Sequence, residues 1–72
     1  MGWRTIGTVS HTDSDGTRYD RRVARNDSTG DTERTFGTGE HMISDKTSRS
    51  VGNTSSDAEA MAKASSDLKS TF

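Results

Sequence analysis

Apolar and β-branched positions alternate with polar ones over the first half of this chain and recur at helical spacing near its end. Three segments of strand-like composition, at 3–11, 17–25 and 32–38, are separated by clusters of Asp, Asn, Ser, Thr and Gly. Such clusters reverse the backbone, and Asp15-Gly16 is typical of a hairpin turn because both residues tolerate positive φ. The pattern predicts an antiparallel meander of three strands joined by short turns.

The segment after the third strand has two interpretations. Residues 41–43 either extend that strand past a glycine bulge or begin a fourth strand at about 41–44. In the second case 48–52 is the returning strand of a further hairpin.

A single helix is predicted from about 57 to 70. Ser56 and Glu59 have the spacing of a capping box, in which each side chain binds a free N–H of the first helical turn. The run 60–64 consists of strong helix formers. The helix presents one narrow apolar stripe, made of Met61, Ala64 or Ser65, Leu68 and Phe72. The sequence therefore predicts one small α+β domain over 1–72, with the helix packed on one face of the sheet.

The apolar positions of the first strand do not share one parity. Trp3 and Val9 fall on one face and Ile6 on the other, so either a bulge near Gly7 changes the register or Ile6 lies outside the core, exposed or buried by a partner. The core predicted from all elements consists of Val9, Tyr19, Val23, Phe36, Met61 and Leu68.

Composition makes this core small. Only 25% of the 72 residues are hydrophobic, and there is no cysteine to form a disulfide or a thiolate metal site. A domain of this size buries only about 60% of the surface that its unfolded chain exposes, so it gains from additional contacts. We therefore expect a small interaction module that forms a homodimer or binds another protein.

The sequence offers little that would support catalysis. The Asp13-x-Asp15-Gly16 turn lacks the spacing of a calcium loop, and His11 and His41 have no arrangement typical of zinc ligands. Residues 36–41 resemble a glycine-rich stretch of some class I methyltransferases, but the βαβ unit that such a loop serves does not fit in a chain this short. We expect no enzyme, no catalytic residue, no metal and no cofactor.

One local charge feature suggests an alternative function. Arginines crowd the second strand, and others on neighbouring strands could join them, which gives Arg4, Arg18, Arg21, Arg22, Arg25 and Arg34. Arginine makes bidentate contacts with phosphate and guanine, so an arginine-rich sheet could bind nucleic acid. The element order is similar to that of the arm-binding domains of tyrosine recombinases and of plant AP2-type domains, which implies a three-stranded sheet in a DNA groove. Together with Trp3, these arginines are the candidate contacts for a partner or a nucleic acid.

Charge and hydropathy bear on the compartment. The net charge is only −1, so there is no overall field to attract nucleic acid or an anionic membrane. No apolar run approaches the length of a signal-peptide core or a membrane span. We expect a cytoplasmic protein that does not contact a membrane.

Overall fold

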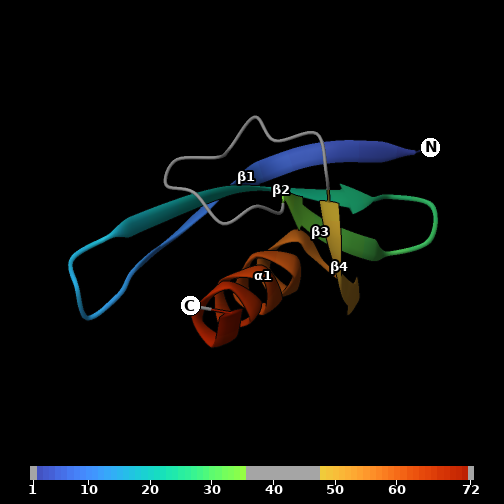
Figure 1. The fold of residues 1–72 in the computed structure, drawn as a ribbon. Helices are drawn as coiled ribbons and strands as arrows, with labels where there is room; N and C mark the ends of the chain where they lie inside the picture. Colours follow the sequence, from blue (N-terminus) through green and yellow to red (C-terminus); the bar gives the residue numbers. More distant parts are fainter. Residues whose placement is uncertain (1, 36–47, 72) are drawn as a thin grey trace.

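In the part of the chain that the structure describes, the fold consists of a four-stranded antiparallel sheet and one C-terminal helix (Figure 1). The computed structural model describes residues 2–35 and 48–71. The sheet follows the chain order β1-β2-β3-β4, with β1 (Trp3–Thr12), β2 (Arg18–Asn26), β3 (Asp31–Thr35) and β4 (Ser48–Asn53). The helix α1 (Asp57–Thr71) packs on one face of the sheet, chiefly against β1. This confirms the predicted α+β class.

The predicted strand boundaries are close to the observed ones. β1, β2 and the returning strand β4 each end within one residue of the prediction. β3 begins at Asp31 and is described as far as Thr35. The rest of the predicted third strand, the strand at 41–44 and the glycine-rich stretch at 36–41 lie outside the described residues.

Two tight turns set the register of the meander. Between β1 and β2, the Asp13 carboxylate accepts hydrogen bonds from the N–H groups of Asp15 and Thr17, and Gly16 has a φ of 88°. Between β2 and β3, Gly30 has a φ of 83° and donates its N–H to the Asn26 carbonyl at 2.7 Å. Glycine supplies both positive φ angles without steric cost.

A β-bulge resolves the parity conflict in β1. Thr5 pairs with Ala24 and Gly7 with Val23, so Ile6 is the extra residue. Beyond the bulge, Val9 points to the helix, and Ile6 packs against the same core. Of the two alternatives for Ile6, the register change is therefore the correct one.

The core lies between α1 and the sheet face that it covers, called here the helix face. Its buried apolar residues are Val9, Val23, Ala60, Ala64 and Leu68, with Ile6, Tyr19, Val51 and Met61 partly buried around them. The predicted core is thus confirmed for Val9, Val23 and Leu68. Tyr19 and Met61 lie at its margin, and Phe36 lies outside the described residues.

The start of α1 follows the predicted cap with one change. Ser56 Oγ accepts the Glu59 N–H at 3.2 Å, and the Ser56 carbonyl accepts the Ala60 N–H at 3.0 Å, so Ser56 is the N-cap. The Glu59 carboxylate reaches back to Ser55, accepting from its N–H at 2.9 Å and its hydroxyl at 2.6 Å. These two bonds, with the Ser55 hydroxyl first, hold the pKa of Glu59 below its ordinary value.

Candidate interaction surfaces

The seven candidate contact residues do not form one surface. Arg18 and Arg22 are exposed on the outer face, which is the sheet face opposite the helix, and Trp3 is half-exposed at the start of β1. The remaining residues, Arg4, Arg21, Arg25 and Arg34, lie on the helix face. Because Tyr19 and Val23 hold the other parity, the sequence predicts that Arg18, Arg22 and Arg4 point away from the helix, and for Arg4 this prediction is wrong. The bulge after Thr5 reverses the parity of the first residues of β1 and places Arg4 beside Arg25.

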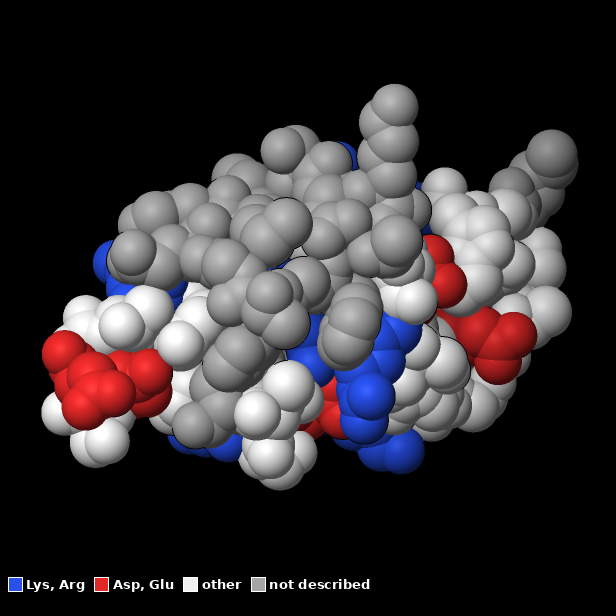
Figure 2. Space-filling model, viewed as in Figure 1, with Lys and Arg blue, Asp and Glu red and all other residues white. Residues whose placement is uncertain are grey.

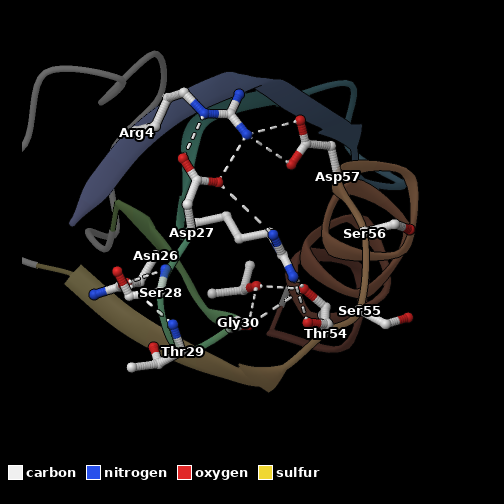
Figure 3. Close-up of polar contacts among 12 residues, drawn as sticks. Arg4, Asn26, Asp27, Ser28, Thr29, Gly30, Thr54, Ser55, Ser56 and Asp57 are labelled. Atoms are coloured by element: carbon white, nitrogen blue, oxygen red, sulfur yellow. Dashed lines mark hydrogen bonds and ion pairs between the residues drawn. The ribbon is translucent and has the colours of Figure 1, made fainter. Parts of the chain in front are cut away.

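Arg4 bridges two carboxylates at the end of the sheet where α1 begins (Figure 3). Its Nη2 donates to Asp27 Oδ1 at 2.9 Å, its Nε donates to Asp27 Oδ2 at 3.0 Å, and Nη2 also contacts Asp57 Oδ2 at 3.0 Å. Asp27 belongs to the β2–β3 turn and Asp57 to the first turn of α1. These bonds, with Asp27 first, raise the pKa of Arg4 above its ordinary value and lower that of Asp27. Arg4 thus ties three segments together.

Arg25 lies opposite Arg4 on the neighbouring strand β2 and joins β2 to the segment that leads into α1. Its Nε donates to Thr54 Oγ1 at 3.0 Å and its Nη2 to the Thr54 carbonyl at 2.8 Å. Thr54 is buried, and its hydroxyl also pairs with that of Thr32 at 2.8 Å. The Arg25 guanidinium therefore serves the fold, and only 14% of its side chain is exposed.

Arg34 has no exposed side-chain surface and spans the core to the C-terminal half of α1. Its Nε donates to Asp67 Oδ2 at 2.7 Å and its Nη2 to Thr71 Oγ1 at 2.9 Å. Arg49 on β4 donates to the same Asp67 carboxylate at 3.1 Å. Arg34 was predicted to join an exposed arginine surface, and its burial between β3 and α1 corrects that prediction.

Arg21 is also buried on the helix face, in the half of β2 that is closer to the β1–β2 turn. Its Nη1 donates to the Asp20 carbonyl at 2.8 Å, and its guanidinium carbon lies 5.8 Å from the centre of the Tyr19 ring. That ring stacks on His11, and its hydroxyl donates to Asp13 at 3.1 Å. Burial would raise the pKa of Asp13, but the N–H of Thr17, the Tyr19 hydroxyl and the N–H of Asp15 together lower it.

Charge on the outer face is balanced locally. Arg18 donates to Asp20 at 2.9 Å, and Ser10 Oγ donates to the same Asp20 oxygen at 2.5 Å. In Figure 2, the visible basic side chains of the described residues lie beside acidic ones. A shallow hollow of about 180 Å³ lies on the outer face, lined among described residues by Thr5, Arg22, Ala24, Glu33, Arg34, Thr35 and Ser48.

The long strand β1 presents a second feature, a free backbone edge. Among the described residues, only those of β2 pair with β1, and its other edge has no partner among them. The direction of the backbone groups follows from two hydrogen bonds of β2. The Arg22 N–H donates to Thr35 Oγ1 on β3, and the Asn26 carbonyl accepts from the Gly30 N–H. The N–H and C=O groups of the even-numbered residues of β2 therefore point toward β3.

Antiparallel geometry then fixes the direction of the β1 backbone groups. Residues opposite the even-numbered positions of β2 form non-hydrogen-bonded pairs, so their own N–H and C=O groups point away from β2. In the regular part of β1 these residues are Thr8, Ser10 and Thr12, whose partners are Arg22, Asp20 and Arg18. All three side chains are exposed, on the outer face. Sequence reasoning missed this edge, although alternating hydroxyl residues in 8–12 were its visible signal.

The described residues contain no helix that is long and apolar enough to cross a membrane. Their His, Asp and Glu side chains form no group of three that could hold a metal ion. Comparison of the chain with protein-family models, with curated proteins and with solved structures found no match.

Proposed function

We propose that this protein is a small, non-enzymatic interaction module that associates with a second copy of itself. The observation that carries the proposal is the composition of the core. Among the described residues, the buried apolar side chains are two valines, two alanines and one leucine, and five polar or charged residues are buried as well. Burial of arginine costs desolvation energy that its ion pairs only partly offset. Association would add the buried surface that the isolated chain lacks.

The exposed surface also suits association with a protein. Trp3 is the large hydrophobic side chain that the described part of the chain exposes, at 50% of its surface. Tryptophan is over-represented among residues that dominate the energy of protein interfaces. Trp3 lies at the start of β1, the strand that also has an edge without a partner among the described residues.

The nucleic-acid alternative has weaker support. Arg4, Arg25 and Arg34 are engaged by acidic or hydroxyl groups that hold the sheet to α1. Arg18 pairs with Asp20, and the net charge is −1. Affinity for DNA comes mainly from phosphate contacts by basic side chains, and this arrangement offers few of them.

The mass in solution tests the proposal. Sedimentation equilibrium over a range of concentrations should give a mass that approaches twice 7.8 kDa and falls toward 7.8 kDa on dilution. A titration with duplex DNA at physiological salt should show no binding. A monomer at every concentration would overturn self-association, and tight, salt-dependent DNA binding by that monomer would favour the alternative.

A further inference from the structure

The two halves of the free β1 edge differ in regularity. The bulge at Ile6 interrupts the N-terminal half, whereas the register from Thr8 opposite Arg22 to Thr12 opposite Arg18 is continuous. A bulge hinders pairing with another strand, but a straight edge without lysine or proline permits it. Segment 8–12 contains neither. It is therefore the part of the edge that can accept a strand.

The opposite edge of the sheet is less suited to pairing. β4 contains a register irregularity at Val51 and a glycine, Gly52, with a φ of 106°. It also carries Arg49, whose side chain is half-exposed and bound to Asp67. An irregular edge that carries a charge resists the addition of a strand.

We propose that Thr8–Thr12 of β1 pairs antiparallel with the same segment of a second copy, about a two-fold axis at Ser10. This proposal rests on the proposed function and specifies its contact. A two-fold interface must be complementary to itself. Segment 8–12 meets this requirement, because pairing about Ser10 places Thr8 opposite Thr12 of the second copy and Ser10 opposite Ser10.

The backbone geometry supports this register. Thr8, Ser10 and Thr12 are the residues whose N–H and C=O groups point to the open edge, as derived from the hydrogen bonds of β2. Each facing pair would exchange two hydrogen bonds, giving about six between the chains. Facing threonine and serine side chains also stabilise a sheet.

Charge does not oppose the contact. The side chains that would face each other across the axis are hydroxyls. Arg18 and Asp20, which lie opposite Thr12 and Ser10 on β2, already form an ion pair with each other at 2.9 Å. The two copies would therefore join their sheets into one continuous eight-stranded sheet without bringing like charges together.

A pair of lysine substitutions tests the location. Ser10→Lys would place two like charges opposite each other at the axis, and this destabilises a sheet. We expect it to raise the dimer dissociation constant by about tenfold or more. Thr5→Lys is the matched control, because Thr5 is also exposed on the outer face of β1 but lies before the bulge. We expect its dissociation constant to stay within about twofold of the parent value. Circular dichroism should show that both variants fold.

A backbone change separates charge from hydrogen bonding. A chain of 72 residues can be assembled by chemical ligation with N-methylserine at position 10. This change keeps the Ser10 hydroxyl that binds Asp20 and puts a methyl group in place of the N–H hydrogen that points to the open edge. It should also weaken the dimer by about tenfold, because the methyl group blocks the approach of a second strand.

The outcomes distinguish this proposal from the proposed function. Weaker dimers for both position-10 variants, with Thr5→Lys unaffected, support pairing through segment 8–12. A parent dimer with unchanged dissociation constants for either position-10 variant overturns the edge contact and leaves self-association standing. Equal weakening by Thr5→Lys overturns the assigned segment. A monomeric parent chain overturns both proposals.

Discussion

Arg34 on β3 donates from Nε to Asp67 Oδ2 on α1 at 2.7 Å, with none of its side chain exposed. The Thr71 hydroxyl and the Thr35 carbonyl accept its remaining bonds. Removal of one partner of a buried ion pair is costly because it leaves an uncompensated charge. This contact therefore links the C-terminal half of α1 to the sheet.

Asp67→Ala should lower the free energy of unfolding by about 3–5 kcal/mol, because it leaves the buried Arg34 guanidinium without its carboxylate partner. The double variant Arg34→Met with Asp67→Ala should recover most of that loss. Urea denaturation followed by circular dichroism measures both. Arg18→Ala is a suitable control, because Arg18 is 61% exposed and a surface ion pair contributes about 0–1 kcal/mol. An Asp67→Ala variant as stable as the parent would show that the ion pair does not hold the helix.

Elements with local signals could be predicted from the sequence. The turn residues marked the ends of β1 and β2, and Ser56 marked the start of α1. The buried stripe of the helix was partly wrong: Ala60, Ala64 and Leu68 are buried, while Met61 lies at the side. Small alanine side chains let the helix approach the sheet closely. Met61 instead extends over Gly7, where an added Cβ would lie 3.0 Å from its methyl carbon.

The roles of the arginines could not be predicted, because they depend on partners distant in sequence. Arg34 and Asp67 are separated by 33 positions, and Arg4 and Asp57 by 53. Which face each arginine occupies depends on bulges, and a one-residue shift exchanges the two faces of a strand. The conflicting parity of Ile6 indicated the bulge in β1. The bulge at Val51 in β4 had no comparable signal.

Removal of the N-cap should weaken α1 at its start. Ser56→Ala loses the acceptor for the Glu59 N–H, and such losses cost about 1 kcal/mol. Ser66→Ala is the matched control, because Ser66 is exposed within the helix and alanine is a better helix former there. Thermal melting of the two variants should therefore shift in opposite directions. Equal melting temperatures would contradict the assignment of Ser56 as the cap.

Substitution of Gly30 should disturb the junction of β3 with the segment before α1. An added Cβ would lie 2.6 Å from the Thr54 carbonyl oxygen, and the positive φ adds strain. Gly16→Ala provides the comparison, because Gly16 has a similar φ and open space around its Cα. Gly16→Ala should cost about 1–2 kcal/mol from backbone strain alone. Gly30→Ala should cost more in the same urea titration, and an equal or smaller cost would show that Thr54 can move aside.

Acid should weaken the contact between Arg4 and Asp27, because it protonates the Asp27 carboxylate. Hydrogen bonds from Arg4 lower the pKa of Asp27 in the folded protein below its ordinary value of 3.8. A carboxylate with a lowered folded-state pKa contributes stability above its unfolded pKa, and that contribution is lost as the pH falls through the folded pKa. The contribution of Asp27 should therefore be complete at neutral pH and decline below about pH 4.

An NMR titration of the Asp27 carboxyl carbon measures this directly. In the parent chain its midpoint should lie below 3.8, and in Arg4→Gln it should move toward that value because the principal donors are gone. Asp27→Asn should unfold with a weaker dependence on acid than the parent, since one of the titrating carboxylates is absent. If Asp27 titrates at or above 3.8 in the parent chain, Arg4 does not hold the β2–β3 turn against the start of α1 in solution. The bridge that joins β1, this turn and the helix would then have to be abandoned.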